Sequence, residues 1–251
     1  MLISQNKKYL TLLAVFLIFI QPAWAGINLD RTRVIFDGNM KSVSLHIDNN
    51  DAKNPYLAQS WLEDEYGNKG GKLPLVVVPP IQRVEPGASS QLRIEALPTI
   101  KNLPQDRESI FYLVIQDIPP KVTGNSVLQI AVQNRVKLMY RPNGLDQHAA
   151  SIEEQWQHKV RLKKSNKQVV ITNPTPYNLT IINVSTKIGG APVDGFKPLM
   201  IHPYDKLEIS LQGNHLGQHP TLNYINDFGG VGSITLQCSD SECVTTERGR
   251  A

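Results

Sequence analysis

Histidines that could hold a metal are few in this 251-residue chain, and they form no complete ligand set. Of six, only His215 and His219 are spaced so that they could chelate one ion. They lie in GNHLGQHP, whose glycines and proline predict a loop, and no third ligand or H-E-x-x-H pattern accompanies them. We interpret them as exposed loop residues, and we expect no metal and no cofactor.

The only two cysteines, Cys238 and Cys243, enclose the polar insert Ser-Asp-Ser-Glu. Their spacing differs from the C-x-x-C of a redox site or a paired zinc knuckle. In an oxidising compartment, so short an insert suits a disulfide that closes a terminal hairpin, with a stabilisation of about 2 kcal/mol. We therefore predict a structural disulfide.

Catalytic motifs are also incomplete. The triplet Asp227-Phe228-Gly229 matches the metal-binding triplet of protein kinases, but no H-R-D loop and no glycine-rich strand with its lysine accompany it. The pair Gly229-Gly230 more simply predicts a turn between two strands. There is no G-x-S-x-G elbow and no assembled nucleophile, base and oxyanion donor, so we expect no enzyme.

The first 25 residues have the features of a secretory signal peptide. Lys7 and Lys8 precede an apolar run over residues 10–20, and Ala23-Trp24-Ala25 fits the A-x-A cleavage pattern. The run is shorter than the roughly 20 residues that span a bilayer. We expect an exported protein that starts near Gly26.

Net charge argues against a nucleic-acid partner. Removal of the signal peptide takes away two lysines and no acidic residue, so the formal charge of +4 falls to +2. The cluster Lys159-Val160-Arg161-Leu162-Lys163-Lys164 alternates charged and apolar residues. The solvated face of a strand is favoured there over a phosphate site.

The elements that must position any site are short β-rich runs separated by turn residues at intervals of about 8 to 15, with no helix-period segment between them. The pattern restarts after YRPNGLDQ, where the polar segment 146–151 forms the expected linker. We predict an all-β protein of antiparallel sandwiches: a signal peptide over 1–25 and two immunoglobulin-like domains over 26–145 and 146–251. Two packed domains at an angle would leave a cleft between them.

One predicted strand is unusually long. In SVLQIAVQNRVKLMYRP, every second residue from Leu128 to Tyr140 is apolar except Asn134, which predicts a half-buried strand of about 13 residues. One sandwich rarely covers so long an apolar row, and an uncovered row would be an aggregation hazard.

The segment LPQDRESIFYLVIQDIPP closely resembles the signature of the periplasmic pilus chaperones, the PapD-like family, with Glu108 before alternating apolar residues and Ile118-Pro119-Pro120 at the end. The similarity extends over the mature chain through LDRTRVIFDG, PYLAQSWLE, EPGASSQLRI, LQIAVQNRVKLMYRP, NPTPYNLT and YINDFGG. Val114 departs from the signature, which usually has Asn there.

The resemblance implies a boomerang, or L-shape, of two immunoglobulin-like domains that escorts pilus subunits, pilins and adhesin, through the periplasm to an outer-membrane usher without ATP. The chaperone lends its long edge strand to subunits that lack their last strand, which is recognition by strand addition, or donor-strand complementation. The free chaperone would have an exposed strand through which it could self-associate. Such a protein serves fimbrium biogenesis at the cell surface.

Site residues carried over from the resemblance fall into three sets. The donor positions are Leu128, Ile130 and Val132; the cations that clamp the subunit's C-terminal carboxylate are Arg33 and Lys137; and the interdomain ion network is Glu108, Arg141 and Asp227. Simple alternation puts Lys137 on the face opposite Leu128, so a strong twist or a bulge is expected between them.

The principal alternative is a secreted immunoglobulin-like adhesin or carbohydrate-binding module. Such a module would stack sugars on aromatic loops, but the only tryptophans are Trp24 in the signal peptide, Trp61 and Trp156. An exported hydrolase is a weaker alternative, because no catalytic set is present.

Overall fold

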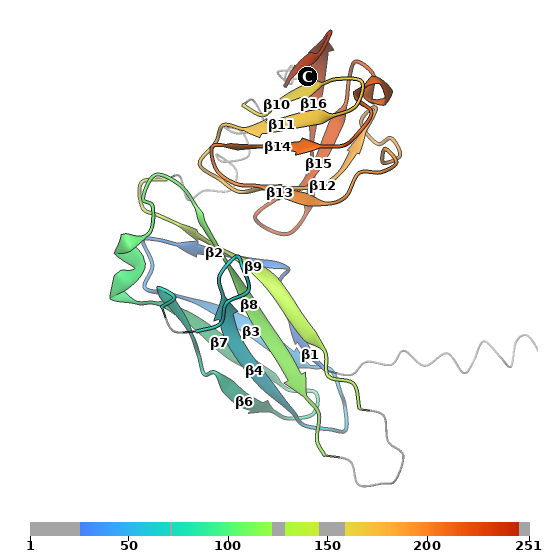
Figure 1. Cartoon of the computed structure of the whole chain (residues 1–251). Helices are drawn as coiled ribbons and strands as arrows, with labels where there is room; N and C mark the ends of the chain where they lie inside the picture. The colour runs from blue at the N-terminus through green and yellow to red at the C-terminus, as the bar shows by residue number, and fades with distance from the viewer. Residues whose placement is uncertain (1–25, 71, 122–128, 146–158, 246–251) are drawn as a thin grey trace, which may run out of the picture.

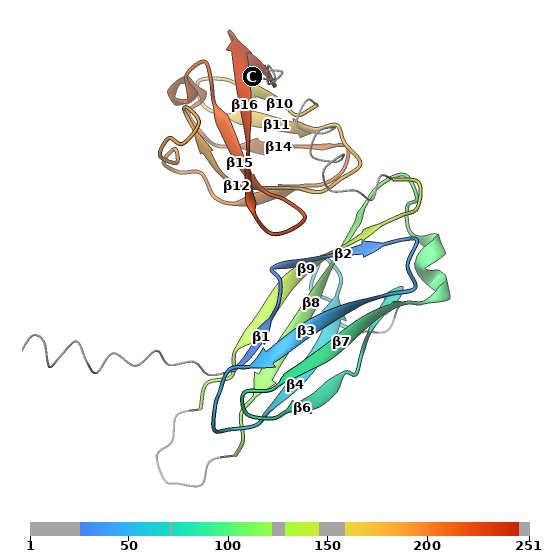
Figure 2. The same ribbon diagram turned by 180° about the vertical axis from the view of Figure 1, so that it is seen from behind.

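The computed structural model describes residues 26–70, 72–121, 129–145 and 159–245. These residues form two β-sandwiches, and the second lies beyond one end of the first and at an angle to it (Figures 1 and 2). Each sandwich has its own buried apolar cluster, one running from Ile27 to Tyr140 and the other from Val160 to Cys243. The prediction of an all-β, two-sandwich fold is thereby confirmed. The predicted signal peptide and the linker segment 146–151 lie outside the described residues.

The first sandwich faces one sheet of four strands against another of five. The four-stranded sheet has the order β1 (Ile27–Leu29), β3 (Ser42–Asn49), β7 (Ser89–Ala96), β5 (Leu75–Val78). The five-stranded sheet has the order β2 (Arg33–Asp37), β9 (Gln133–Arg141), β8 (Ser109–Ile118), β4 (Tyr56–Glu63), β6 (Ile81–Val84). A short 3-10 helix, η1 (Pro98–Asn102), follows β7.

The second sandwich is one eight-stranded sheet folded on itself. Its order is β13 (Leu199–Ile201), β12 (Leu179–Ser185), β15 (Thr221–Ile225), β16 (Val231–Ser239), β17 (Glu242–Thr245), β10 (Arg161–Lys164), β11 (Val169–Asn173), β14 (Asp205–Ile209). Strand β16 pairs with β15 along its first half and with β17 along its second, so it belongs to both layers. On β10, Leu162 is buried between exposed Arg161 and Lys163, as expected of a solvated strand face.

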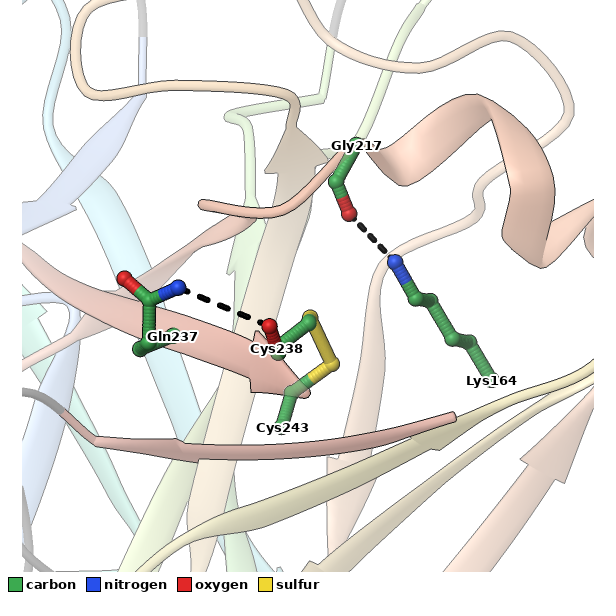
Figure 3. Close-up of a disulfide and its surroundings, with 5 residues drawn as sticks. All are labelled: Lys164, Gly217, Gln237, Cys238 and Cys243. Carbon is green, nitrogen blue, oxygen red and sulfur yellow. Dashed lines mark hydrogen bonds between the residues drawn. A yellow bond between two sulfur atoms is a disulfide. The ribbon is translucent and has the colours of Figure 1, made fainter. Parts of the chain in front are cut away.

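The predicted disulfide is present at the β16–β17 hairpin, where Cys238 and Cys243 are directly paired (Figure 3). Lys164 donates a hydrogen bond to the Gly217 carbonyl nearby. His215 lies in a second 3-10 helix, η2 (Gly213–Leu216), rather than in the predicted irregular loop. In the described ranges, no group of three His, Cys, Asp or Glu side chains could hold a metal, and no helix is long and apolar enough to cross a membrane.

The first β-rich run of the sequence, NLDRTRVIFD, divides between the two sheets. Its beginning, β1, pairs antiparallel with β3, whereas its end, β2, pairs parallel with β9. The prediction of a purely antiparallel sandwich is therefore wrong at this position, because the chain changes sheets after Leu29. Strand β2 covers only Lys137–Arg141 of β9. On that side of β9, residues 133–136 have no strand neighbour among the described residues.

The expected 13-residue strand is shorter in the structure. Strand β9 begins at Gln133. Ile130 and Val132 precede it and belong to no strand, and Leu128 lies outside the described residues. The β8–β9 pairing runs from Gln116–Gln133 to Ser109–Tyr140 without a register shift. No bulge therefore lies between Gln133 and Lys137 in the β8–β9 pairing, and the pairing does not cover the stretch from Leu128 to Val132. Period-two alternation places Lys137 on the outer face, opposite buried Leu138.

Candidate functional site

Two cations lie side by side where the five-stranded sheet meets the second sandwich. Arg33 is the first residue of β2, and its Cα partner in the parallel β2–β9 pairing is Lys137. Their chain neighbours Val34 and Leu138 are buried in the core. Because side chains alternate along a strand, Arg33 and Lys137 point to the opposite face.

Both cations make hydrogen bonds to the second sandwich. Arg33 Nη1 donates to the carbonyl oxygen of Ile225 on β15, at 3.0 Å. Lys137 Nζ donates to Thr180 Oγ1 on β12, at 2.8 Å. The site is thus assembled from two strands of the first sandwich and two of the second.

The electrostatics of this pair are unfavourable in the free protein. Burial lowers the pKa of Arg33, despite the nearby charges of Asp227 and Glu108. Burial and the charge of Arg33 together lower the pKa of Lys137 to about 8. In the described part of the chain, no ion pair includes either cation, and the buried Arg33 Nε has no hydrogen-bond partner. An anion placed between the two would relieve their repulsion and their desolvation.

A second charged cluster lies at the far end of β9. Arg141 is almost fully buried, and its Nε and Nη2 donate to Glu108 Oε1 at 2.9 and 2.7 Å. Its Nη1 lies 2.9 Å from Asp227 Oδ2, in the β15–β16 hairpin. Burial alone would lower the pKa of Arg141, but the charges of Glu108 and Asp227 outweigh that effect and raise it. These three residues therefore form an ion network between the two sandwiches.

Further contacts extend this network into the second sandwich. Glu108 Oε2 accepts hydrogen bonds from the backbone N–H and the side-chain Nδ2 of Asn178, at 2.7 and 3.1 Å. The Arg141 guanidinium carbon lies 5.1 Å from the centre of the Tyr177 ring. The carboxylate of Glu108 is thus shared between an arginine of its own sandwich and two N–H groups of the other. These contacts join the two sandwiches at this end of β9.

Apolar side chains are exposed next to the unpaired part of β9. Ile130 is 69% exposed and Val132 is 46% exposed. Main-chain groups tie this segment to the end of β8: Asp117 N donates to Val132 O at 3.0 Å, and Val132 N donates to Asp117 Oδ1. The segment therefore presents a strand edge and two aliphatic side chains to solvent.

The structure brings together most of the residues that the sequence assigned to a site. Arg33 and Lys137 are adjacent, as are Glu108, Arg141 and Asp227, while Ile130 and Val132 lie on an exposed segment. The carried-over donor residue Leu128 lies outside the described residues. Sequence reasoning did not assign the contacts of Thr180, Asn178 and the Ile225 carbonyl. Thr180 and Asn178 belong to NPTPYNLT, which was noted only as a family motif.

The fold and the site define a class: a two-sandwich protein with paired cations where the two sandwiches meet and a partly unpaired strand edge that leads to them. Comparison with known families agrees with this class. Residues 26–146 match the family described as "Pili and flagellar-assembly chaperone, PapD N-terminal domain", and residues 155–235 match "Pili assembly chaperone PapD, C-terminal domain". The chain belongs to the PapD-like family of pilus-assembly chaperones.

Individual relatives cover nearly the whole chain. It is 43% identical to the probable fimbrial chaperone YfcS of Escherichia coli K12, over 90% of this chain and 88% of that protein. It is 39% identical to the chaperone protein PapD of Escherichia coli, over 94% and 97%. Among solved structures, the periplasmic chaperone SfaE matches with a TM-score of 0.66 and 32% identity, over 84% of this chain and 98% of that one.

Proposed function

We propose that this protein binds pilus subunits in the periplasm by strand addition to the unpaired edge of β9, with the subunit's C-terminal carboxylate between Arg33 and Lys137. One observation carries this proposal: buried Arg33 and partly buried Lys137, which form no ion pair among the described residues, lie side by side where the unpaired edge ends. A carboxylate at the end of an added strand has the charge and the position that this site requires.

The position of the cations sets the direction of the added strand. Residues 129–132 lead into the unpaired edge of β9, residues 133–136, which runs toward Lys137, and β2 begins at that point. A subunit strand that lies along this edge and ends in a carboxylate at Lys137 must run in the same direction as β9. The added strand is therefore parallel to β9, as β2 is.

The alternation of side chains then needs no bulge. Ile130 and Val132 have the same parity as Val136 and Leu138, which face the core side of the sheet. Lys137 has the opposite parity and contacts Thr180 of the second sandwich from the other face. The carboxylate is a main-chain group at the strand end, so it does not have to share a face with the apolar side chains. Leu128, Ile130 and Val132 would enter the subunit's open groove, and the clamp would fix their register.

The network of Glu108, Arg141 and Asp227 serves this site indirectly. Thr180 and Ile225 contact the clamp cations from the second sandwich, so they reach Lys137 and Arg33 only while the sandwiches keep their relative orientation. The ion network holds that orientation with a buried arginine shared by two carboxylates. The network acts mainly by holding the geometry of the two sandwiches. An intact buried ion pair adds only modestly to the free energy of unfolding, whereas the loss of one partner lowers it strongly.

Processing, location and domain limits complete the proposal. The predicted cleavage after Ala25 would release the mature chain into the periplasm, where an outer-membrane usher would receive the complex. Two separate apolar cores support domains over 26–145 and 146–251. Binding of this kind needs neither ATP nor catalysis, and we propose that the protein has no enzymatic activity.

The sugar-binding alternative has no support at the one tryptophan that the structure describes. The ring of Trp61 has the Lys69 ammonium 4.0 Å from its centroid, and its Nε1 donates to Glu63 at 2.9 Å. One face of the ring and its polar atom are therefore already in use. The family relationship favours the chaperone function over this alternative.

The test uses a peptide with the sequence of a pilus subunit's last strand, as the free acid and as the C-terminal amide. We expect Arg33→Ala to weaken binding of the acid by at least about thirtyfold, the lower range for truncating one partner of a buried charge pair. Arg93→Ala is the matched control, because Arg93 lies on β7 of the same sandwich with its side chain 54% exposed. Amidation should cost wild type at least a similar factor and should cost Arg33→Ala less, because Lys137 is then the only clamp cation left to bind the carboxylate. Equal affinity of wild type for acid and amide would refute the clamp.

A further inference from the structure

Asp117 is a buried carboxylate at the base of the exposed segment, and the clamp does not use it. It lies near the end of β8 and is only 3% exposed. Its Oδ1 accepts the backbone N–H of Val132. Within residues 26–70, 72–121, 129–145 and 159–245, no ion pair includes Asp117. A buried carboxylate without a neighbouring cation is costly, so a positive charge beside Asp117 would stabilise the folded chain.

Gly26 lies directly beside this carboxylate. A Cβ atom added to Gly26 would lie 2.3 Å from Asp117 Oδ2, which is closer than any real contact. The distance from Asp117 Oδ2 to the Gly26 Cα therefore exceeds 2.3 Å by at most about one bond length, roughly 1.5 Å. The Gly26 nitrogen is bonded to the same Cα. Gly26 is buried, and its carbonyl accepts the N–H of Asn50 at 3.3 Å, which fixes the residue against the sandwich.

Glycine suits this position because the Asp117 carboxylate occupies the space that a Cβ would fill. Residue 26 is the predicted first residue of the mature chain, so its nitrogen would become a free ammonium group on cleavage.

We infer that cleavage before Gly26 creates a buried ion pair between the new α-ammonium group and the Asp117 carboxylate, and that this pair fixes the base of the exposed segment at Val132. The inference rests on the proposed processing site. Cleavage hydrolyses the Ala25–Gly26 peptide bond with one water, which leaves a carboxylate on the released peptide and an amine on Gly26 that takes up a proton at neutral pH. The uncleaved chain has a neutral amide at this position.

The consequence is a link between maturation and the binding segment. In the mature chain, one carboxylate would hold both the amino terminus and the N–H of Val132, which precedes the unpaired edge of β9. Tyr56 is one ionisable group close enough to interact with Asp117: burial and the charges of Asp51 and Asp117 raise the pKa of Tyr56. Tyr56 does not supply a positive charge.

The experiment measures the proton affinity of the amino terminus in the full protein from the periplasm. Intact mass first tests whether the chain starts at Gly26, and this result does not depend on whether the ion pair forms. Trace labelling with acetic anhydride between pH 6 and 10, quantified by mass spectrometry of the N-terminal peptide, then gives the α-amino pKa. We expect a proton affinity at least tenfold above that of a free terminus, whose pKa is about 7.7 to 8.0. We also expect Asp117→Asn to return it to that range and Asp51→Asn to leave it raised.

A second variant covers the case in which Asp117→Asn does not fold. One alanine inserted between Ala25 and Gly26 moves the ammonium group by about 3.8 Å along the chain and leaves Asp117 in place. We expect an ordinary α-amino pKa in this variant and at least tenfold faster hydrogen exchange at the Val132 amide. An ordinary pKa in a wild-type chain that starts at Gly26, or equal Val132 exchange in the two proteins, would overturn the inference.

Discussion

Lys137 gives the proposed clamp a pH dependence that can be worked out from the structure. Its pKa is lowered to about 8 by burial and by the charge of Arg33. A carboxylate binds the charged form, so the apparent affinity follows the fraction of Lys137 that carries a proton in the free protein. That fraction is about nine-tenths at pH 7 and about one-tenth at pH 9. Affinity for a subunit's C-terminal strand should therefore fall about tenfold over this range, or about 1.4 kcal/mol.

Isothermal titration calorimetry with the free-acid peptide measures this effect. The peptide carboxylate, with a pKa near 3.5, stays ionised throughout, so the titrating group belongs to the protein. Lys137→Arg keeps its charge across the range, and its affinity should stay flat between pH 7 and 9. Lys137→Met should bind weakly, again without pH dependence. A wild-type affinity that is equally flat would show that Lys137 does not hold the carboxylate.

The same pKa predicts how stability depends on pH in the absence of a subunit. The pKa of Lys137 is about 8 in the folded protein, whereas in the unfolded chain it lies near the ordinary lysine value of 10.5. The unfolded state therefore binds more protons between these values, and the free energy of unfolding should rise with pH across this window. Subunit affinity and stability should thus change in opposite directions above pH 8.

Three further predictions concern the surroundings of the clamp. Three residues form the ion network, and Arg141→Met should lower the free energy of unfolding by about 3 to 5 kcal/mol, because it leaves Glu108 and Asp227 without their shared partner. Small-angle scattering of this variant should show a broader range of interdomain angles, and an unchanged scattering profile would contradict the orienting role. Ile130→Ala should leave the melting temperature unchanged and weaken subunit binding, whereas the buried control Leu45→Ala should cost about 2 to 5 kcal/mol of stability; a large loss of stability in Ile130→Ala would place Ile130 in the core. The double change Cys238→Ser and Cys243→Ser should lower stability by about 2 kcal/mol without changing peptide affinity, since the disulfide closes a hairpin of the second sandwich; calorimetry of unfolding and of binding checks both parts.

The sequence was a reliable guide where the determining pattern is local. Period-two alternation located the strands, and the restart of that pattern after YRPNGLDQ indicated two sandwiches. The short insert between Cys238 and Cys243 was enough to predict their disulfide. The sequence was less reliable for the long strand, because alternation continues through Val132 and Ile130 although β8 pairs with β9 only from Gln133. Alternation records which face a residue would take, not whether a neighbouring strand is present.

The division of the first run into β1 and β2 shows the same limit more clearly. The apolar pattern of NLDRTRVIFD is compatible with one strand, yet its two halves pair with partners in different sheets. Only this change of sheet leaves residues 133–136 without a neighbour on one side of β9. The unpaired edge, on which the proposed function depends, was therefore not visible in the local sequence.

What the sequence determined by itself is the all-β class, the family motifs and the identity of the charged residues, because these depend on residue types at short spacing. The tertiary structure decided which of those residues lie together. It placed Arg33 next to Lys137 although they are distant in the chain, and it brought Thr180 and the Ile225 carbonyl from the second sandwich to meet them. The burial that lowers the pKa of Lys137 arises from these long-range contacts. A local sequence pattern does not record such burial, because desolvation depends on everything that surrounds a group in space.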